Sequence, residues 1–482
     1  MRTRLLEVLS SEEIIRIDRE SRRILKKSGV RVRHEHALEL LDAIGCDVDR
    51  SNSMVRMNEQ VINRAVEGSP ESFRLYSRDS SGSILLGEEE VVFGPGGFAV
   101  FVEDADTGER RVANRKDLRE HLRLSDFLPG CEFNHVNVFP SNLPEKTADL
   151  HIWADALIYQ KKPIMNENYN AHSVDVLVRM AAAVAGSTRH ALEHPQVCLD
   201  VCVVSPLTHE TRQVDLLLAG ARYGLPISIN SGPIAGGTSP VTLASVVLQA
   251  NVELLSALVI TLAGAQEQDM PIPPVLYGSW GRHMDMRYGT VTMGGPEFSL
   301  LKVCTAQMGR FYGLPTRGGG ALSDSLLSDA QSGYEKMITT AVPALAGVNY
   351  ISGMGLNESE NLQSLAQLVI DDEIVAMVKR LMRGVLIDRE HLAADLIIET
   401  GPEGNFLDSD HTLRYFRDEL FDPVISNRMK YERWQETGSL PVQERARERA
   451  GQILNEHHPE REMDEKLARE IHEIVEGETR NL

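Results

Sequence analysis

Aromatic, amide and glycine residues, rather than acids and bases, dominate the ends of the chain's short extended segments. Trp280, one of three tryptophans, follows a Gly-Ser step, and Arg317 stands directly before three consecutive glycines. Glycine lets a ligand approach the backbone closely, and a guanidinium can bind a carboxylate through two parallel hydrogen bonds. The pattern therefore favours a binding pocket over a proton-transfer site. Two structural interpretations stay open: Trp280 as a packing aromatic, and Arg317 paired with an internal acid such as Asp324 or Glu335.

Recognisable metal and nucleophile signatures are missing from the sequence. Cys198 and Cys202 share one face of a predicted strand, but they lie roughly 13 Å apart along it, too far to chelate one zinc ion. The histidine pairs 34/36 and 457/458 have no third ligand nearby in charged helical surroundings. No Ser-His-Asp or Cys-His signature is recognisable. We expect no bound metal, and we assign no catalytic acid, base or nucleophile.

Repeated strand–helix units must position these residues. A helix stops at Gly224, a strand begins at Pro226, and a glycine-lined loop leads to a helix that Ser239-Pro240 marks. The same opening recurs at Gly313. The count and spacing of extended segments predict a TIM barrel, with its site at the C-terminal ends of the strands. The eight segments are Val91–Gly94, Glu132–Val138, Pro163–Asn168, Val197–Val204, Pro226–Asn230, Pro274–Tyr277, Pro315–Gly319 and Val348–Ser352.

The predicted barrel divides the chain into three regions. Residues 1–90 are predicted to form a mainly helical cap, residues 91–390 the α/β barrel, and residues 391–482 a helical C-terminal extension. The extension is expected to pack on the barrel or on another subunit, which allows a homo-oligomer. A doubly wound open sheet is the alternative fold, but no strand is followed by a G-x-G-x-x-G turn or a P-loop.

Composition limits the partners and the compartment. The chain has 482 residues, a formal net charge of −20 and a pI near 5.3, which disfavours binding to nucleic acid or to an anionic membrane surface. Its five cysteines are an odd number and widely spread, so a disulfide framework is not expected. We find neither an export signal nor a membrane span. A cytoplasmic location fits best.

Several motifs, in the right order over nearly the whole chain, resemble the trimethylamine methyltransferase superfamily. They are Leu75-Tyr-Ser-Arg-Asp79, Gly232-Pro-Ile-Ala-Gly-Gly-Thr-Ser-Pro240, Gly313-Leu-Pro-Thr-Arg-Gly-Gly319, Ser323-Asp-Ser325 and Asp329-Ala-Gln-Ser-Gly-Tyr-Glu335. The resemblance implies a TIM barrel that passes an N-methyl group to the cob(I)alamin of a separate corrinoid protein. Members that act on trimethylamine use a pyrrolysine, and none appears here. The chain therefore resembles the branch without pyrrolysine, typified by glycine betaine:corrinoid methyltransferase.

That resemblance implies a small quaternary amine as substrate. A quaternary ammonium leaves as a neutral tertiary amine after its methyl group is attacked, so no proton donor is needed. Aromatic faces hold such a cation by about 0.5 to 2 kcal/mol each. We expect Trp280, Tyr277 and Phe98 in this role, Glu167 as charge partner, and Arg317 as partner of a betaine carboxylate. Further expected positions are Asn230, Asp324 and Tyr334 for substrate, and Gly318 and Gly319 for the cofactor.

Two rival functions remain open. A barrel lyase or aldolase would need a lysine at a strand end to form a Schiff base, and none is evident in the sequence. A non-catalytic quaternary-amine binding protein would share the pocket and would differ only in failing to transfer the methyl group.

Overall fold

Eight parallel strands form the centre of the molecule. The computed structural model describes residues 6–79 and 82–481. The strands follow the order β6-β19-β18-β15-β13-β11-β10-β9, and every pairing is parallel. Amide nitrogens of Glu132 and Phe133 donate to the Phe93 carbonyl at 2.8 and 3.2 Å, which closes the barrel between β6 and β9. The predicted TIM barrel is confirmed, and the open sheet is excluded.

All eight predicted strands are present, most within two residues of the expected ends. They are β6 (Val92–Gly94), β9 (Asn134–His135), β10 (Ile164–Glu167), β11 (Val197–Val203), β13 (Ile227–Ser231), β15 (Val275–Ser279), β18 (Thr316–Gly319) and β19 (Tyr350–Ser352).

Helices surround the barrel and begin and end where local chemistry dictates. Gly224 and Gly313 end two of them in the left-handed conformation, both at φ 67°, which glycine adopts without steric cost. One predicted start is wrong: the helix after Ser239-Pro240 begins at Leu243, with Thr242 at the N-cap position. The surrounding helices are α4 (Arg115–Phe127), α5 (Ala148–Tyr159), α6 (Ala171–Ala185), α8 (Thr211–Tyr223), α9 (Leu243–Glu267), α10 (Pro296–Tyr312), α11 (Ala330–Leu345) and α12 (Leu365–Arg383).

Helix α9 is long and apolar enough to cross a membrane, with a mean hydropathy of 1.9 over its most apolar window. However, 89% of that window is buried inside the protein, against α8, α10 and the cap helices. A helix that is apolar on all sides is expected when other elements surround it. Helix α9 is thus a core helix of the barrel wall.

The first ninety residues are a mixture of helices and strands. Three helices, α1 (Ser11–Lys27), α2 (Glu35–Ala43) and α3 (Glu59–Glu67), pack on α9. The hairpin of β4 (Ser72–Tyr76) and β5 (Ser83–Gly87) packs with residues near the starts of the barrel strands, including Phe133, Met165 and Leu276. The hairpin therefore closes the N-terminal end of the barrel, which leaves the opposite end for a site.

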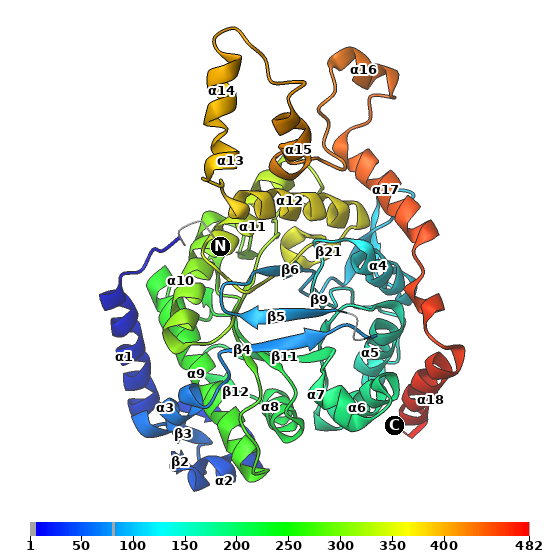
Figure 1. The fold of residues 1–482 in the computed structure, drawn as a ribbon. Coiled ribbons are helices and arrows are strands. Elements are labelled where there is room, and N and C mark those ends of the chain that lie inside the picture. The colour runs from blue at the N-terminus through cyan, green and yellow to red at the C-terminus, as the bar shows by residue number, and fades with distance from the viewer. Residues whose placement is uncertain (1–5, 80–81, 482) are drawn as a thin grey trace.

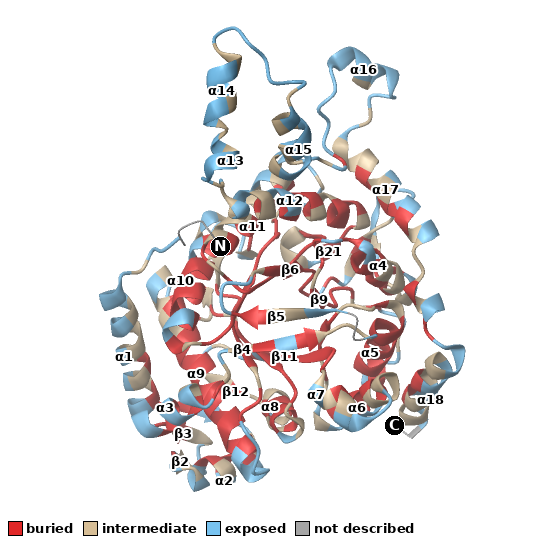
Figure 2. Ribbon diagram, in the orientation of Figure 1, coloured by how far each residue is buried: buried red, intermediate tan, exposed pale blue. Residues whose placement is uncertain are grey.

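The C-terminal extension has two parts. Helices α17 (Val442–Glu456) and α18 (Glu465–Asn481) pack along the barrel wall, on α12 and α4 and on α5 and α6. Four short helices between them and α12 project away from the barrel and are largely exposed (Figures 1 and 2): α13 (Arg389–Leu392), α14 (Ala394–Thr400), α15 (Asp410–Glu419) and α16 (Tyr431–Glu436).

Two small sheets lie over the C-terminal ends of the barrel strands. One joins β14 (Ile234–Ala235), β16 (Arg282–Asp285) and β17 (Thr290–Thr292). The other joins β20 (Leu356–Asn357), β21 (Leu362–Gln363), β7 (Phe101–Glu103) and β8 (Arg110–Val112). The turn η2 (Glu358–Glu360) connects β20 to β21. Both sheets contribute side chains to the cavity described next.

Candidate functional site

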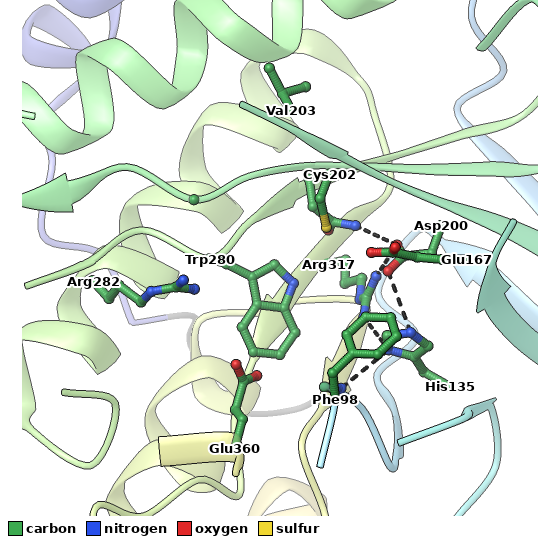
Figure 3. A pocket seen from close by; sticks show the side chains of 13 residues that line it. Phe98, His135, Glu167, Asp200, Cys202, Val203, Trp280, Arg282, Arg317 and Glu360 are labelled. Atoms are coloured by element: carbon green, nitrogen blue, oxygen red, sulfur yellow. Dashed lines mark hydrogen bonds and ion pairs between the residues drawn. The ribbon is translucent and has the colours of Figure 1, made fainter. Parts of the chain in front are cut away.

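A cavity of about 240 Å³ opens at the C-terminal end of the barrel. Its wall comes from the ends of β9, β10, β11, β13 and β18, from the segments after β6 and β15, and from the two small sheets (Figure 3). This is the place where TIM barrels carry their sites. The lining side chains are Phe98, His135, Glu167, Asp200, Cys202, Val203, Asn230, Trp280, Arg282, Arg317 and Glu360.

Arg317 lies at the floor of the cavity, fully buried, and its guanidinium is already bonded. One terminal nitrogen donates to Asp200 at 2.5 Å and to Ser228 Oγ at 3.0 Å. The other contacts His135 Nδ1 at 2.8 Å, and Nε donates to Ser352 Oγ at 3.3 Å. The internal acid that pairs with Arg317 is therefore Asp200, rather than Asp324 or Glu335. Asn230 also donates to Asp200, so it belongs to the same network.

His135 is the neutral member of this network. Burial, together with the nearby Arg317, lowers the pKa of His135 to about 3. Since Nδ1 accepts a hydrogen bond from Arg317, the ring proton sits on Nε2, which faces Asp200 Oδ2 at 3.4 Å. The histidine thus contacts Arg317 through Nδ1 and carries no charge at neutral pH, while its buried Nε2 makes no hydrogen bond to a described residue.

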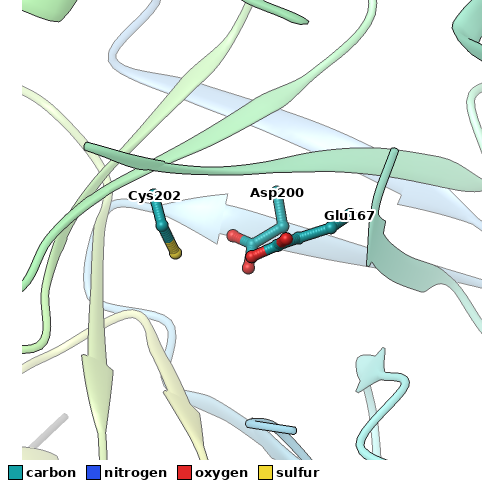
Figure 4. A group of neighbouring side chains, drawn as sticks. All are labelled: Glu167, Asp200 and Cys202. Atoms are coloured by element: carbon teal, nitrogen blue, oxygen red, sulfur yellow. The ribbon is translucent and has the colours of Figure 1, made fainter. Parts of the chain in front are cut away.

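Glu167, Asp200 and Cys202 form a group whose ligand atoms lie within 4.8 Å of one another (Figure 4). These atom types could hold a metal ion. However, Arg317 pairs with Asp200, and Arg212 pairs with Glu167 at 2.6 Å, so cations already neutralise both carboxylates. Burial raises the pKa of the Cys202 thiol well above its usual value. A protonated thiol is a weaker nucleophile than a thiolate.

Arg282 and Glu360 reach the cavity from the two small sheets. Arg282 Nε and Glu360 Oε1 are buried and have no hydrogen-bond partner in the described parts of the chain. Burial raises the pKa of Glu360 to about 7, and Arg282 acts in the opposite direction. Burial likewise raises the pKa of Glu167 to about 7.

Two aromatic side chains provide faces for a cation. Trp280 lines the cavity and lies between Arg282 and Arg317 in the view of Figure 3. Phe98 is partly exposed at its edge and contacts His135 edge to face, with ring centroids 5.8 Å apart. The Arg317 guanidinium already lies over the Trp280 ring, 5.4 Å from its centroid. The remaining indole surface that faces the cavity and the Phe98 ring are thus the surfaces available to a positively charged ligand.

Five of the ten predicted site residues line the cavity: Phe98, Glu167, Asn230, Trp280 and Arg317. Tyr277 does not, because alternate residues of a strand face opposite sides. Its hydroxyl donates to Asn251 of α9 at 2.7 Å, outside the barrel. Tyr334 lies on the exposed surface of α11.

Asp324, Gly318 and Gly319 also lie outside the cavity, with structural roles. Asp324 accepts hydrogen bonds from the Met293 amide and the Ser359 hydroxyl, at 2.7 Å each. A side chain on Gly319 would clash with Trp280 and Phe298, and one on Gly318 would meet Lys302. The two glycines therefore permit close packing, and their positions do not fit a cofactor contact.

Sequence reasoning missed five polar residues of the site: His135, Asp200, Cys202, Arg282 and Glu360. One signal was available, since Cys198, Asp200 and Cys202 alternate along β11 and so share a face. No local pattern marks Arg282 or Glu360, because Arg282 lies in a short strand and Glu360 in a turn, and the rest of the fold decides where both lie.

Known proteins resemble this chain over nearly its whole length. The family model for trimethylamine methyltransferase (MTTB) matches residues 1–482. A trimethylamine methyltransferase of Desulfitobacterium hafniense is 30% identical over 467 residues, covering 97% of this chain and 93% of the relative. A glycine betaine methyltransferase of the same species is 30% identical over 465 residues, covering 95% of each.

Among solved structures, the monomethylamine methyltransferase of Methanosarcina barkeri aligns with a TM-score of 0.49 at 11% identity, covering 92% of each chain. The full-length match to the family model and the two relatives at 30% identity settle the family. The chain belongs to the trimethylamine methyltransferase family of enzymes.

Proposed function

We propose that this protein transfers a methyl group from a quaternary amine of the glycine betaine type to the cob(I)alamin of a partner corrinoid protein. The observation that carries the proposal is the cavity itself: two aromatic faces, Trp280 and Phe98, beside the carboxylate of Glu360. Such a site suits a permanent cation. The relative named glycine betaine methyltransferase supports the same substrate class.

Methyl transfer from a quaternary amine needs little acid–base catalysis. When the methyl carbon is attacked, the leaving amine departs neutral, so positioning is the main task of the protein. This matches a cavity in which the histidine is neutral and the thiol stays protonated. The corrinoid supplies the nucleophile when its protein docks, and the residues of this chain hold and orient the ammonium group.

Within the cavity, Glu167 is the weaker charge partner. Arg212 already pairs with it, whereas no ion pair to a described residue neutralises Glu360. The proposal therefore assigns the main attraction for the ammonium group to Glu360. The corrinoid partner, a cytoplasmic location and a homo-oligomer belong to the same proposal. All five cysteines are free thiols, which suits a reducing compartment.

The test is methyl transfer to free or protein-bound cob(I)alamin, followed by absorbance. We expect transfer from at least one quaternary amine in a panel of glycine betaine, proline betaine, carnitine and choline. We expect none from trimethylamine, because the neutral amine is a poor electrophile without further activation. Comparable rates on trimethylamine and a quaternary amine would refute the assignment. Tight binding of a quaternary amine without any transfer would favour the binding-protein function instead.

The lyase alternative has less support from the geometry. None of the residues that line the cavity is a lysine. The buried Lys302 of α10, whose pKa burial lowers well below its usual value, donates its terminal nitrogen to the carbonyls of Ser279 and Gly281, at 2.6 and 3.1 Å. A lysine held by two backbone carbonyls supports the loop that carries Trp280 and is not placed to form a Schiff base.

A further inference from the structure

The charged groups of the cavity are paired, with two exceptions of opposite sign. Arg317 pairs with Asp200, Arg212 pairs with Glu167, and His135 is neutral. Arg282 and Glu360 remain, and no ion pair joins them. Arg282 Nε and Glu360 Oε1 are both buried without a hydrogen-bond partner in the described ranges. Buried polar groups are normally satisfied, so two orphans of opposite charge in one cavity need an explanation.

The backbone that carries Arg282 is fixed by the fold. Its amide donates to the Pro233 carbonyl at 3.1 Å, and β16 pairs with β14 at this residue. Lys302 holds the carbonyl of the preceding residue, Gly281. By contrast, Arg287 of the same hairpin is exposed and forms its own ion pair with Asp285 at 2.6 Å. The two arginines are five residues apart, yet only Arg282 reaches the cavity.

Glu360 lies in a turn with an unusual backbone conformation. Glu358, Ser359 and Glu360 have φ values of 51°, 49° and 80°, a run of three residues in a region that side chains disfavour. Such conformations cost about 1 to 3 kcal/mol each and persist where the surroundings hold them, commonly at functional sites. The strained turn therefore indicates that the position of Glu360 serves a function.

The clamp that holds the turn comes from the Ser323-Asp324-Ser325 segment. The amide of Glu358 donates to the Ser325 carbonyl at 2.8 Å, and the amide of Ser359 to the Ser323 carbonyl at 3.0 Å. The Ser359 hydroxyl donates to Asp324 at 2.7 Å. Asp324 is thus a positioning residue for the turn, although it does not touch the cavity.

The two orphan groups point toward the same aromatic ring. Figure 3 shows the guanidinium of Arg282 and the carboxylate of Glu360 both directed at the Trp280 indole, from different sides. A ligand lying against Trp280 can therefore reach a cation at one end and an anion at the other. A simple quaternary cation would satisfy Glu360 only and would leave Arg282 without a partner.

We propose that Arg282 and Glu360 form a zwitterion receptor in which Arg282 binds the substrate carboxylate and Glu360, with Trp280, binds the quaternary ammonium. The inference rests on the proposed function and narrows its substrate class to betaines. It also moves the carboxylate contact from Arg317 to Arg282. A planar guanidinium suits a carboxylate because two parallel hydrogen bonds can form.

The first test compares Arg282→Gln with the matched control Arg287→Gln. The binding of glycine betaine and choline is measured by calorimetry; the two differ in having a carboxylate or a hydroxymethyl group. We expect Arg282→Gln to weaken glycine betaine binding at least about 30-fold, the lower end for breaking a buried charge pair. Choline binding should change less than about 3-fold, and the control should bind both normally. Equal losses for both ligands would overturn the proposal.

The second test uses betaines with one, two and three methylene groups between nitrogen and carboxylate. A receptor with two fixed ends should prefer one length in the wild type, and Arg282→Gln should bind all three similarly. A preference that survives the substitution would show that Arg282 does not contact the carboxylate.

The third test addresses the other end of the receptor. Glu360→Gln should weaken glycine betaine and choline alike, whereas Glu358→Gln, on the outer side of the turn and paired with Arg110, should not. Glu360→Gln should also raise the melting temperature at pH 8, because it removes a buried, unpaired charge. A lower melting temperature with unchanged binding would assign Glu360 a structural role only.

These binding experiments separate the two proposals. If the wild type binds betaines in an Arg282-dependent manner but transfers no methyl group, the receptor stands and the methyl transfer fails. If the wild type transfers methyl groups while Arg282→Gln keeps its betaine preference, the methyl transfer stands and the receptor is refuted. If the wild type binds no betaine of the series, the receptor is refuted.

Discussion

Two arginines share one cavity, and their surroundings differ completely. Arg317 is fully buried, with its nitrogens bonded to Asp200, Ser228, His135 and Ser352. Arg282 has a buried Nε that lacks any hydrogen-bond partner in the described chain. The same type of side chain thus forms part of a rigid cavity floor at Arg317 and remains available to a ligand at Arg282.

The comparison teaches that pairing, rather than residue type, decides what a charged side chain can bind. A guanidinium that already has a carboxylate gains little from a second one, whereas an unpaired buried group gains the full benefit of a partner. The same contrast separates Glu167, paired with Arg212, from Glu360. The paired groups fix the shape of the cavity, and the unpaired groups, Arg282 and Glu360, select its ligand.

The largest expected effect comes from breaking the ion pair between Arg317 and Asp200. Arg317→Ala leaves Asp200 buried without its cation, so stability should fall by about 3 to 5 kcal/mol, measured by chemical denaturation. The ratio of binding constants for glycine betaine and choline should stay unchanged, because Arg317 does not contact the carboxylate. Arg317→Ala with Asp200→Asn should recover part of the loss. A stable Arg317→Ala protein that no longer distinguishes the two ligands would reverse the roles of the two arginines.

The next prediction sharpens the contrast through pH. Burial raises the pKa of Glu360, and of Glu167, to about 7, so these carboxyl groups are neutral below that pH and charged above it. A bound quaternary cation favours the charged form. The dissociation constant should therefore fall roughly tenfold between pH 6 and pH 8. In Glu360→Gln most of this dependence should disappear. An affinity that weakens as pH rises would contradict the assignment.

The smallest effects are expected at two predicted site residues outside the cavity. Tyr277→Phe removes a buried hydrogen bond to Asn251, which should cost about 1 kcal/mol of stability. Tyr334→Phe, on an exposed helix surface, should change stability by less than about 0.5 kcal/mol. Neither should alter the binding of glycine betaine. A weaker binding constant for either variant in a folded protein would place that tyrosine in the site.

Most of the barrel was predictable because its signals are local. The eight strands and the helix ends at Gly224 and Gly313 follow from extended apolar runs, glycine stops and proline starts. The capping box of Ser10 and Glu13 at the start of α1 is a further local signal of this kind. The start of α9 was less predictable, because Ser239 lies in the preceding turn and the helix begins after Thr242, whose side chain makes no capping hydrogen bond.

The site was predictable only in part. Position at a strand end identified Phe98, Glu167, Asn230, Trp280 and Arg317 correctly as cavity residues. The same rule failed for Tyr277, where a shift of one residue along the strand turns the side chain to the other face. It also could not reveal that Asp200 neutralises Arg317, since the two residues are 117 positions apart.

The sequence by itself determined the family, the barrel and the chemical character of the site, because motifs, periodicity and residue types are written locally along the chain. Only the tertiary structure decided which charges are paired and which remain open. Arg282 and Glu360 come from separate small sheets, and the clamp at Ser323-Asp324-Ser325 holds the turn that carries Glu360. Burial and pairing depend on what the rest of the chain places beside each group.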